Sequence, residues 1–161
     1  GIGSLAPIEQ ELLAALKEDG ARLLEQLIND FNLAAPRQAL EPGEQDYGLR
    51  DREVLTLLGL IQLRRPYYYN EALGRGRFPL DEALWLLGGY SSGVAKMMCR
   101  AGAISPSFEA ASQDLLAYAG LPVPGRQIQR LILIMGPLIA LKRKELPPPL
   151  KPPVNSRGQV I

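Results

Sequence analysis

Two short stretches of the chain carry residues at a spacing that metal-binding turns use. Glu41 and Glu44 flank a Pro-Gly pair, and Asn70 and Leu73 stand three residues apart ahead of a glycine-containing segment. Two such pairs on facing turns build a tetrahedral zinc site when all four residues are cysteine or histidine. Leucine cannot bind a metal, and carboxylates with an amide suit hard cations better than zinc. The positions therefore predict a degenerate zinc knuckle that holds no metal, although the first pair also fits a plain acidic turn.

The composition narrows the possible chemistry further. The 161 residues contain no histidine and a single cysteine, Cys99. The lack of histidine excludes His-based acid–base catalysis, Ser-His and Cys-His nucleophiles, and His-ligated metals. No pair of carboxylates stands out in a glycine-rich or strand-end context. The remaining routes to catalysis use carboxylates, lysine or tyrosine.

The cysteine content and the hydropathy of the sequence indicate the cellular compartment of the protein. One cysteine cannot form an internal disulfide and fits a reducing compartment. We find neither a secretory signal nor an apolar run long enough to span a bilayer. The sequence thus predicts a cytoplasmic protein with no membrane partner.

Charge is unevenly distributed although the net charge is only +1. Residues 1–47 hold nine acids and three bases, whereas residues 48–161 hold fifteen bases and eight acids. Such asymmetry is typical of an acidic interaction segment followed by a basic segment that faces nucleic acid. An ordinary solvated surface is the alternative explanation.

The apolar pattern predicts a long helix over residues 7–31. Its apolar residues recur every three or four positions, which places them on one face. They are Ile8, Leu12, Leu16, Leu23, Leu27 and Phe31. This stripe either packs on its own domain or pairs with a second copy, which would give a homodimer through the N-terminal helix.

A β-hairpin is predicted over residues 54–69, with Gly59 at its turn. Its second strand carries Arg64 and Arg65 next to three consecutive tyrosines, residues 67–69. Interleaved arginine and tyrosine can grip phosphates and stack on bases. Tyrosines in such a strand also complete a small hairpin core, which is the simpler interpretation.

Four helices are expected after the hairpin, over residues 81–87, 91–101, 106–119 and 124 to about 144. The last two are separated by a turn that contains Gly120, Pro122 and Pro124, in the order of a helix-turn-helix. The second helix of such a pair presents its N-terminal residues to base edges, and arginine and glutamine pair well with guanine and adenine. The candidate base-reading residues are Arg126, Gln127, Gln129 and Arg130. Because the turn is longer than the standard one, an ordinary αα-hairpin is the alternative.

Several short segments follow one another along the chain in an order that is typical of a known family. They are residues 55–59 (LTLLG), residues 63–68 (LRRPYY), Gly74, Gly76, residues 79–84 (PLDEAL), residues 105–111 (SPSFEAA) and residues 115–120 (LLAYAG). Together they resemble the N-terminal, non-catalytic region of bacterial insertion-sequence transposases of the ISKra type, over roughly residues 50–145. The resemblance implies a DNA-binding region that recognises the ends of the element.

In that family the region is joined to an RNase H-like domain that uses acidic residues and a divalent metal for strand transfer. The resemblance also implies cysteines at the positions that Asn70 and Leu73 occupy here. No catalytic residue can be carried over to this chain, so we expect a protein that is not an enzyme and carries no cofactor. We expect Leu73 to be buried in place of a thiolate, with the tyrosines closing the hairpin.

The sequence thus predicts a mainly α fold in four parts. These are an N-terminal helix over residues 1–32, a connector and β-hairpin with the degenerate knuckle over residues 33–80, a helical DNA-binding-like domain over residues 81–146, and a proline-rich linker over residues 147–161. Phosphate contacts are predicted for Arg64, Arg65, Arg75, Arg77, Lys142, Arg143 and Lys144, which would make DNA affinity strongly salt-dependent. The alternative function is a self-associating structural fragment with no nucleic-acid role.

Overall fold

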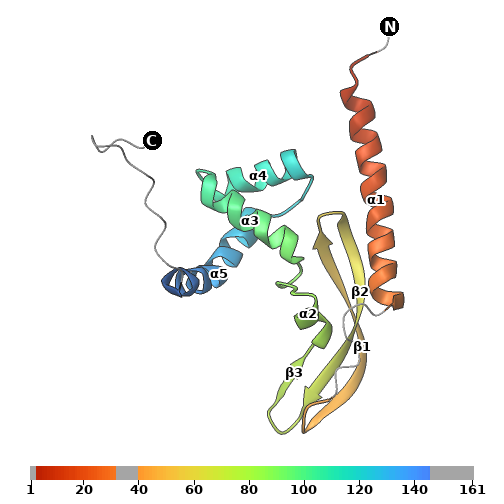
Figure 1. Cartoon of the computed structure of the whole chain (residues 1–161), viewed down its shortest axis with the longest axis vertical. Helices are drawn as coiled ribbons and strands as arrows, with labels where there is room; N and C mark the ends of the chain where they lie inside the picture. The colour runs from red at the N-terminus through yellow and green to blue at the C-terminus, as the bar shows by residue number, and fades with distance from the viewer. Residues whose placement is uncertain (1–2, 32–39, 146–161) are drawn as a thin grey trace, which may run out of the picture.

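The computed structural model describes residues 3–31 and 40–145. The elements follow in the order α1 (Ala6–Phe31), β1 (Glu44–Thr56), β2 (Gly59–Asn70), β3 (Arg75–Arg77), α2 (Pro79–Ala83), α3 (Ser92–Ile104), α4 (Phe108–Ala119) and α5 (Gly125–Glu145). The β-hairpin stands between α1 on one side and α3, α4 and α5 on the other (Figure 1). The described part is therefore mixed α and β, and the prediction of a mainly α fold is correct only in part.

The sheet is antiparallel with the strand order β1-β2-β3. β1 and β2 pair from Glu44 opposite Asn70 to Thr56 opposite Gly59, and β3 pairs only with the last three residues of β2. The hairpin is longer than predicted because β1 extends back to Glu44, into the segment interpreted as a connector. The outer half of β1 is exposed on both faces, so its residues lack the alternation that marks a strand in a sequence.

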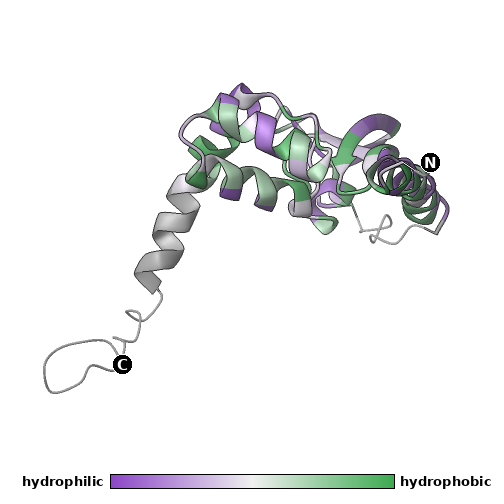
Figure 2. Ribbon diagram, turned by 90° about the horizontal axis from the view of Figure 1, so that it is seen from above, coloured by the Kyte–Doolittle hydropathy of each residue, from purple (hydrophilic) through white to green (hydrophobic). Residues whose placement is uncertain are grey.

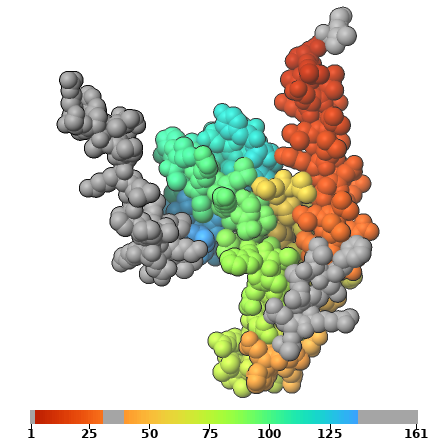
Figure 3. Space-filling view, in the orientation of Figure 1, coloured from red at the N-terminus to blue at the C-terminus, as the bar shows by residue number. Residues whose placement is uncertain are grey.

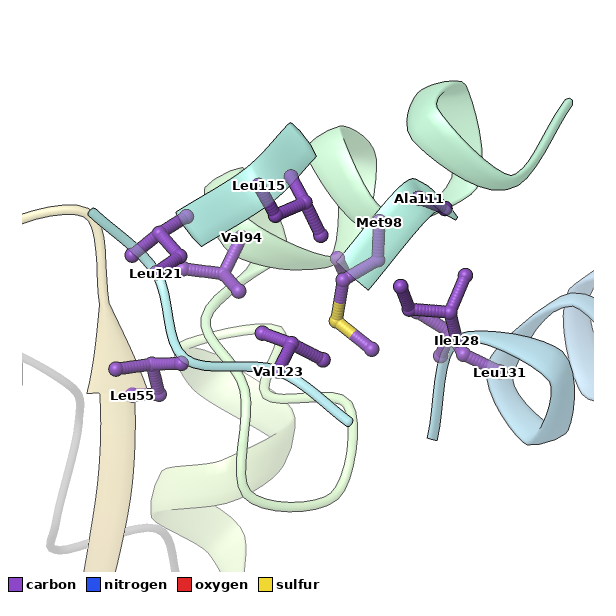
Figure 4. Packing of buried hydrophobic residues seen from close by; sticks show 10 residues of the cluster. Leu55, Val94, Met98, Ala111, Leu115, Leu121, Val123, Ile128 and Leu131 are labelled. Atoms are coloured by element: carbon purple, nitrogen blue, oxygen red, sulfur yellow. The ribbon is translucent and has the colours of Figure 1, made fainter. Parts of the chain in front are cut away.

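The sheet separates two hydrophobic cores. Val54 and Leu55 are both buried, and because neighbours on a strand point to opposite faces, each enters a different core. The Val54 core joins β1 and β2 to α1 and α2, and includes Ala21, Ile28, Ile61, Leu63 and Leu80. The Leu55 core is built by α3, α4 and α5, and Figure 4 shows Leu55 reaching from β1 toward Val123.

The backbone of Leu55 reinforces this junction. Its N–H donates to the carbonyl oxygen of Gly89 at 2.8 Å, and its carbonyl oxygen accepts from the N–H of Ser91 at 3.0 Å. Ser91 is also the N-cap of α3, since its hydroxyl accepts from the N–H of Val94. Helix α3 therefore begins directly at the free edge of β1.

Helix α1 covers the open edge of β2. Beside residues 60–66 of β2 the described part of the sheet has no third strand. The Asn29 side chain donates from Nδ2 to the Gln62 carbonyl at 2.8 Å and accepts at Oδ1 from the Arg64 N–H at 3.0 Å. The Gln62 N–H donates to the carboxylate of Glu25. These side chains satisfy backbone groups that would otherwise be open to pairing with another chain.

The helix predictions hold for four of the five helices in the described part. α1, α3, α4 and α5 begin and end within a few residues of the expected positions, and the residues between α4 and α5 and on their facing sides are buried. They include Ala111, Leu115, Leu121, Val123, Ile128 and Leu131. Helix α2 is shorter than expected, because the chain turns after Leu84.

The view in Figure 2 is nearly along α1, which lies at one end of the molecule. None of the helices in the described residues has the combination of length and hydropathy needed to cross a bilayer.

Replacing Leu55 tests whether the junction between sheet and bundle holds the fold together. Leu55→Ala removes a side chain from the α3–α5 core, and we expect it to lower the free energy of unfolding by about 2–4 kcal/mol in urea titrations. The matched control is Leu60→Ala, since Leu60 faces Leu55 across the hairpin but is exposed, and its effect should stay within about 0.5 kcal/mol. Equal effects of the two substitutions would contradict this role of Leu55.

Candidate nucleic-acid interface

The N-terminal half of α5 presents a polar face to solvent. Ile128 and Leu131 bury the opposite side of the helix in the core. The four residues predicted to read bases lie on or beside the solvent face: Arg126, Gln129 and Arg130 are exposed, and Gln127 is half-buried at its edge. The structure therefore brings these four side chains together on one surface.

A hollow of about 320 Å³ opens beside this face. It is lined by Gln127, Arg130, Leu131 and Ile134 of α5, by Arg52 of β1, and by residues 87–90, which lead into α3. The described residues that line it include two guanidinium groups and no carboxylate. Such a lining suits an anion, because two cations and no carboxylate face the hollow.

Sequence reasoning missed Arg52. The sequence around Arg52 contains no recognisable binding motif, and Arg52 reaches the hollow only because the chain folds β1 against residues 87–90. Its guanidinium lies close to the glycine pair of the 87–90 segment: a Cβ built on Gly88 or Gly89 would lie 4.0 or 3.9 Å from Arg52 Nη2. It also lies 3.9 Å from the carboxylate of Asp81, so one acid is near but does not line the hollow.

Arg65 does not occupy a phosphate-binding position. Its side chain is only 5% exposed, and Nη1 donates to Oδ2 of Asp81 at 2.6 Å. The guanidinium carbon lies 3.7 Å from the centroid of the Phe78 ring. Burial lowers the pKa of Arg65, while the charge of Asp81 opposes that shift. Arg65 therefore links β2 to α2 within the fold.

Arg77 is also engaged within the hairpin. Its Nε and Nη2 donate to the two carboxylate oxygens of Glu44 at 2.7 and 2.8 Å, and its guanidinium lies over the ring of Tyr68. Arg64 and Arg75 are exposed, but Arg64 lies 3.8 Å from Asp51. Figure 1 shows β3, which carries Arg75 and Arg77, at the far end of the hairpin from α5.

Phosphate contacts were also predicted for three residues near the end of α5. The side chains of Lys142, Arg143 and Lys144, near the end of α5, lie outside the described part of the structure.

The two turns of the degenerate knuckle do lie together. Glu44 and Asn70 are partners across β1 and β2, and the Glu41 N–H donates to Glu44 Oε1 at 2.7 Å. Asn70 is buried, donates from Nδ2 to the Pro42 carbonyl at 3.4 Å, and accepts at Oδ1 from the Leu73 N–H at 3.1 Å. A side-chain amide thus connects the two turns that a metal would connect in a zinc knuckle.

The expectation that Leu73 is buried is wrong, since it is 60% exposed. The backbone of Leu73, rather than its side chain, makes the contact with Asn70. Gly43 leaves room for this arrangement: its φ is 86°, and a Cβ there would lie 3.0 Å from Asn70 Nδ2. In the described residues no group of three or more Cys, Asp or Glu side chains is arranged to hold a metal.

The tyrosines close the hairpin rather than forming a free stacking surface. Tyr47 of β1 packs edge-on against Tyr67 and Tyr69, with ring centroids 6.3 and 5.4 Å apart, and Tyr67 lies 4.8 Å from Phe78. A hydrogen bond to Glu71 raises the pKa of Tyr47. The simpler interpretation of the tyrosine run therefore fits the structure.

Comparison with known proteins identifies no relative. No protein-family model matches the chain, and the search of curated proteins finds no similar sequence. The resemblance to insertion-sequence transposases therefore rests on the segments named above.

The Glu44–Arg77 pair should make stability depend on acid pH. The hydrogen bond from Arg77 lowers the pKa of Glu44 in the folded protein. A carboxyl group whose pKa is lower in the folded state adds stability above its unfolded pKa, and this stability is lost as pH falls through the folded value. Glu44→Gln should therefore lower the melting temperature at pH 7 and flatten its decline below about pH 4.

Circular dichroism melts between neutral and acid pH measure this effect. Glu41→Gln, at the exposed end of the same turn, should follow the wild-type curve. A Glu44→Gln curve that stays parallel to wild type at every pH would show that the pair contributes no acid-dependent stability.

Proposed function

We propose that this protein binds DNA, without chemistry, through the solvent face of α5 and the hollow beside it. The observation that carries the proposal is the convergence of Arg126 and Arg130 on α5 with Arg52 on β1. Arg52 and Arg130 line one hollow, and Arg126 lies one helical turn before Arg130. Cations that gather on one face form the electrostatic footprint of a nucleic-acid site.

The geometry of the α4–α5 pair supports base reading. Gly125, the first residue of α5, lies against the backbone of α4, because a Cβ built on it would lie 2.8 Å from the Phe108 carbonyl oxygen. This close approach fixes where α5 starts relative to α4. Arg126, Gln129 and Arg130 then occupy the first two turns, the part of a recognition helix that enters the major groove.

The structure alters the set of residues that we propose to contact phosphates. Arg52 joins the set, whereas Arg65 and Arg77 leave it because their guanidinium groups are held by Asp81 and Glu44. Arg64 and Arg75 are exposed and are retained as outlying contacts. Within this proposal, the ends of a mobile element are the sites that the resemblance to transposases suggests.

Fluorescence anisotropy with a labelled DNA duplex across a salt series tests the proposal. We expect Arg130→Ala to weaken binding about tenfold and Arg126→Ala/Arg130→Ala by about 100-fold, since one base contact contributes about 1–3 kcal/mol. Arg52→Ala should instead weaken binding to all sequences and lower the salt slope by about one, as expected for a lost phosphate contact.

Arg22→Ala is the matched control. Arg22 is an exposed arginine on α1, so its removal changes the net charge equally without touching the proposed face. The proposal fails if the wild-type protein does not bind DNA at low salt, or if Arg22→Ala weakens binding as much as Arg130→Ala.

A second candidate function, self-association, is favoured by the outer side of α1. Ile8, Leu12 and Leu16 are each more than half exposed. At about 100° per residue they lie on the side of α1 roughly opposite Ala21 and Ile28, which pack on the sheet. Figure 3 shows that the first turns of α1 stand clear of the rest of the molecule, and the first contact with the bundle is made by Lys17, which donates to the Ala119 carbonyl at 3.0 Å. A second copy of the helix would bury this stripe.

Sedimentation velocity tests self-association. If the stripe pairs with a second copy, Leu12→Glu/Leu16→Glu should convert the wild-type dimer into a monomer, because it places charges in the interface. Leu116→Glu, at an equally exposed leucine on α4, should leave the dimer intact. A wild-type protein that sediments as a monomer at all concentrations would exclude this candidate.

A further inference from the structure

Trp85 holds a backbone conformation that is unfavourable for its residue type. Its φ is 56°, and it is the one non-glycine residue with positive φ in the described part of the chain. The left-handed region brings Cβ close to the following carbonyl oxygen, so bulky residues rarely adopt it.

The turn at the end of α2 imposes this conformation. The Trp85 N–H donates to the Glu82 carbonyl at 3.2 Å, and the Leu86 N–H donates to the Asp81 carbonyl at 2.9 Å. These are the two hydrogen bonds of a Schellman motif, in which the residue after the C-cap is left-handed and is usually glycine. Leu84 is the C-cap, so Trp85 occupies the glycine position.

The tryptophan ring contributes little to the turn or the core. Trp85 is 78% exposed, whereas its neighbours Leu84 and Leu86 pack against the core that contains Leu80. The hydrogen bonds and these leucines close the turn. A glycine at this position would relieve the backbone and remove a large apolar ring from water, so the ring points to a contact outside the molecule.

The position of Trp85 indicates the chemistry of that contact. Trp85 precedes Leu87 by two residues, which limits their Cα separation to about 7 Å. Leu87 lines the hollow that holds Arg52 and Arg130. The backbone of Trp85 is thus close to the hollow. An exposed aromatic ring on a segment next to two arginines suits a ligand that combines negative charge with a flat π surface, and nucleic acid has both in adjacent phosphates and bases.

We infer that Trp85 stacks on an unpaired base of a nucleic acid whose phosphate lies at Arg52. The inference rests on the proposed function and extends it from duplex DNA to single-stranded DNA or a locally opened duplex. In a fully paired duplex the bases stack on one another and offer no free face, so the Trp85 contact requires an unpaired base.

Tryptophan fluorescence tests the inference directly, because Trp85 is the only tryptophan in the chain. The probes are a labelled DNA single strand of about 20 nucleotides and the blunt, fully paired duplex of the same sequence. Binding of each probe is measured by the anisotropy of the label and by the emission of Trp85. The single strand should quench Trp85 emission as anisotropy saturates. Trp85→Gly should bind the single strand about tenfold more weakly, bind the duplex as wild type does, and melt a few degrees higher.

Trp85→Phe is the matched variant that keeps an aromatic ring, and it should retain most of the single-strand affinity. Unchanged emission at saturating single strand, or equal affinity of wild type and Trp85→Gly, overturns the inference while leaving the proposed function standing. No anisotropy change with either probe overturns both. A Trp85→Gly variant that melts well below wild type assigns the ring a structural role and also overturns the inference.

Discussion

The backbone of Leu55 is the constraint on which the rest of the structure depends. Its N–H and carbonyl both bind residues that lead into α3, and its side chain enters the core of the three-helix bundle. The adjacent Val54 enters the other core with α1 and α2. One strand therefore fixes both halves of the molecule. The same contact holds residues 87–90 against β1, and this placement puts Arg52 of the sheet beside Arg130 of the bundle.

At the opposite end of the hairpin, directional polar contacts take the place that a metal has in a zinc knuckle. A structural metal ties two turns through four strong bonds and supplies folding energy outright. Here the amide of Asn70 joins the two turns, and the Glu44–Arg77 pair joins β1 to β3. Such bonds are individually weak, so this end of the hairpin also relies on the packing of Tyr47, Tyr67 and Phe78.

Structural features that depend on neighbouring residues could be predicted from the sequence, whereas features that depend on residues distant in the sequence could not. Helical spacing of apolar residues located α1, α4 and α5, and the buried end of the hairpin was predicted because its apolar residues have strand spacing. The roles of Arg65 and Arg77 were missed because their partners, Asp81 and Glu44, are distant in the sequence and a charged residue in a strand suggests exposure. Arg52 was missed because its surroundings exist only after folding. Helix α2 was expected to run to Leu87, but it ends at Ala83, because the chain turns at Trp85, where no glycine marks the turn in the sequence.

Three features of the molecule do not favour the stability of the isolated chain: the exposed apolar stripe of α1, the arginines gathered on α5, and the left-handed backbone of Trp85. Departures of this kind concentrate at functional sites. A second copy bound to the outer stripe of α1 would use none of the residues of the arginine face of α5. A symmetric pair joined through α1 would present two α5 faces, the arrangement with which dimeric helix-turn-helix proteins meet two half-sites. The two candidate functions are therefore compatible, because dimerisation through α1 would raise the avidity of the proposed DNA binding without sharing any residue with the proposed DNA-binding surface.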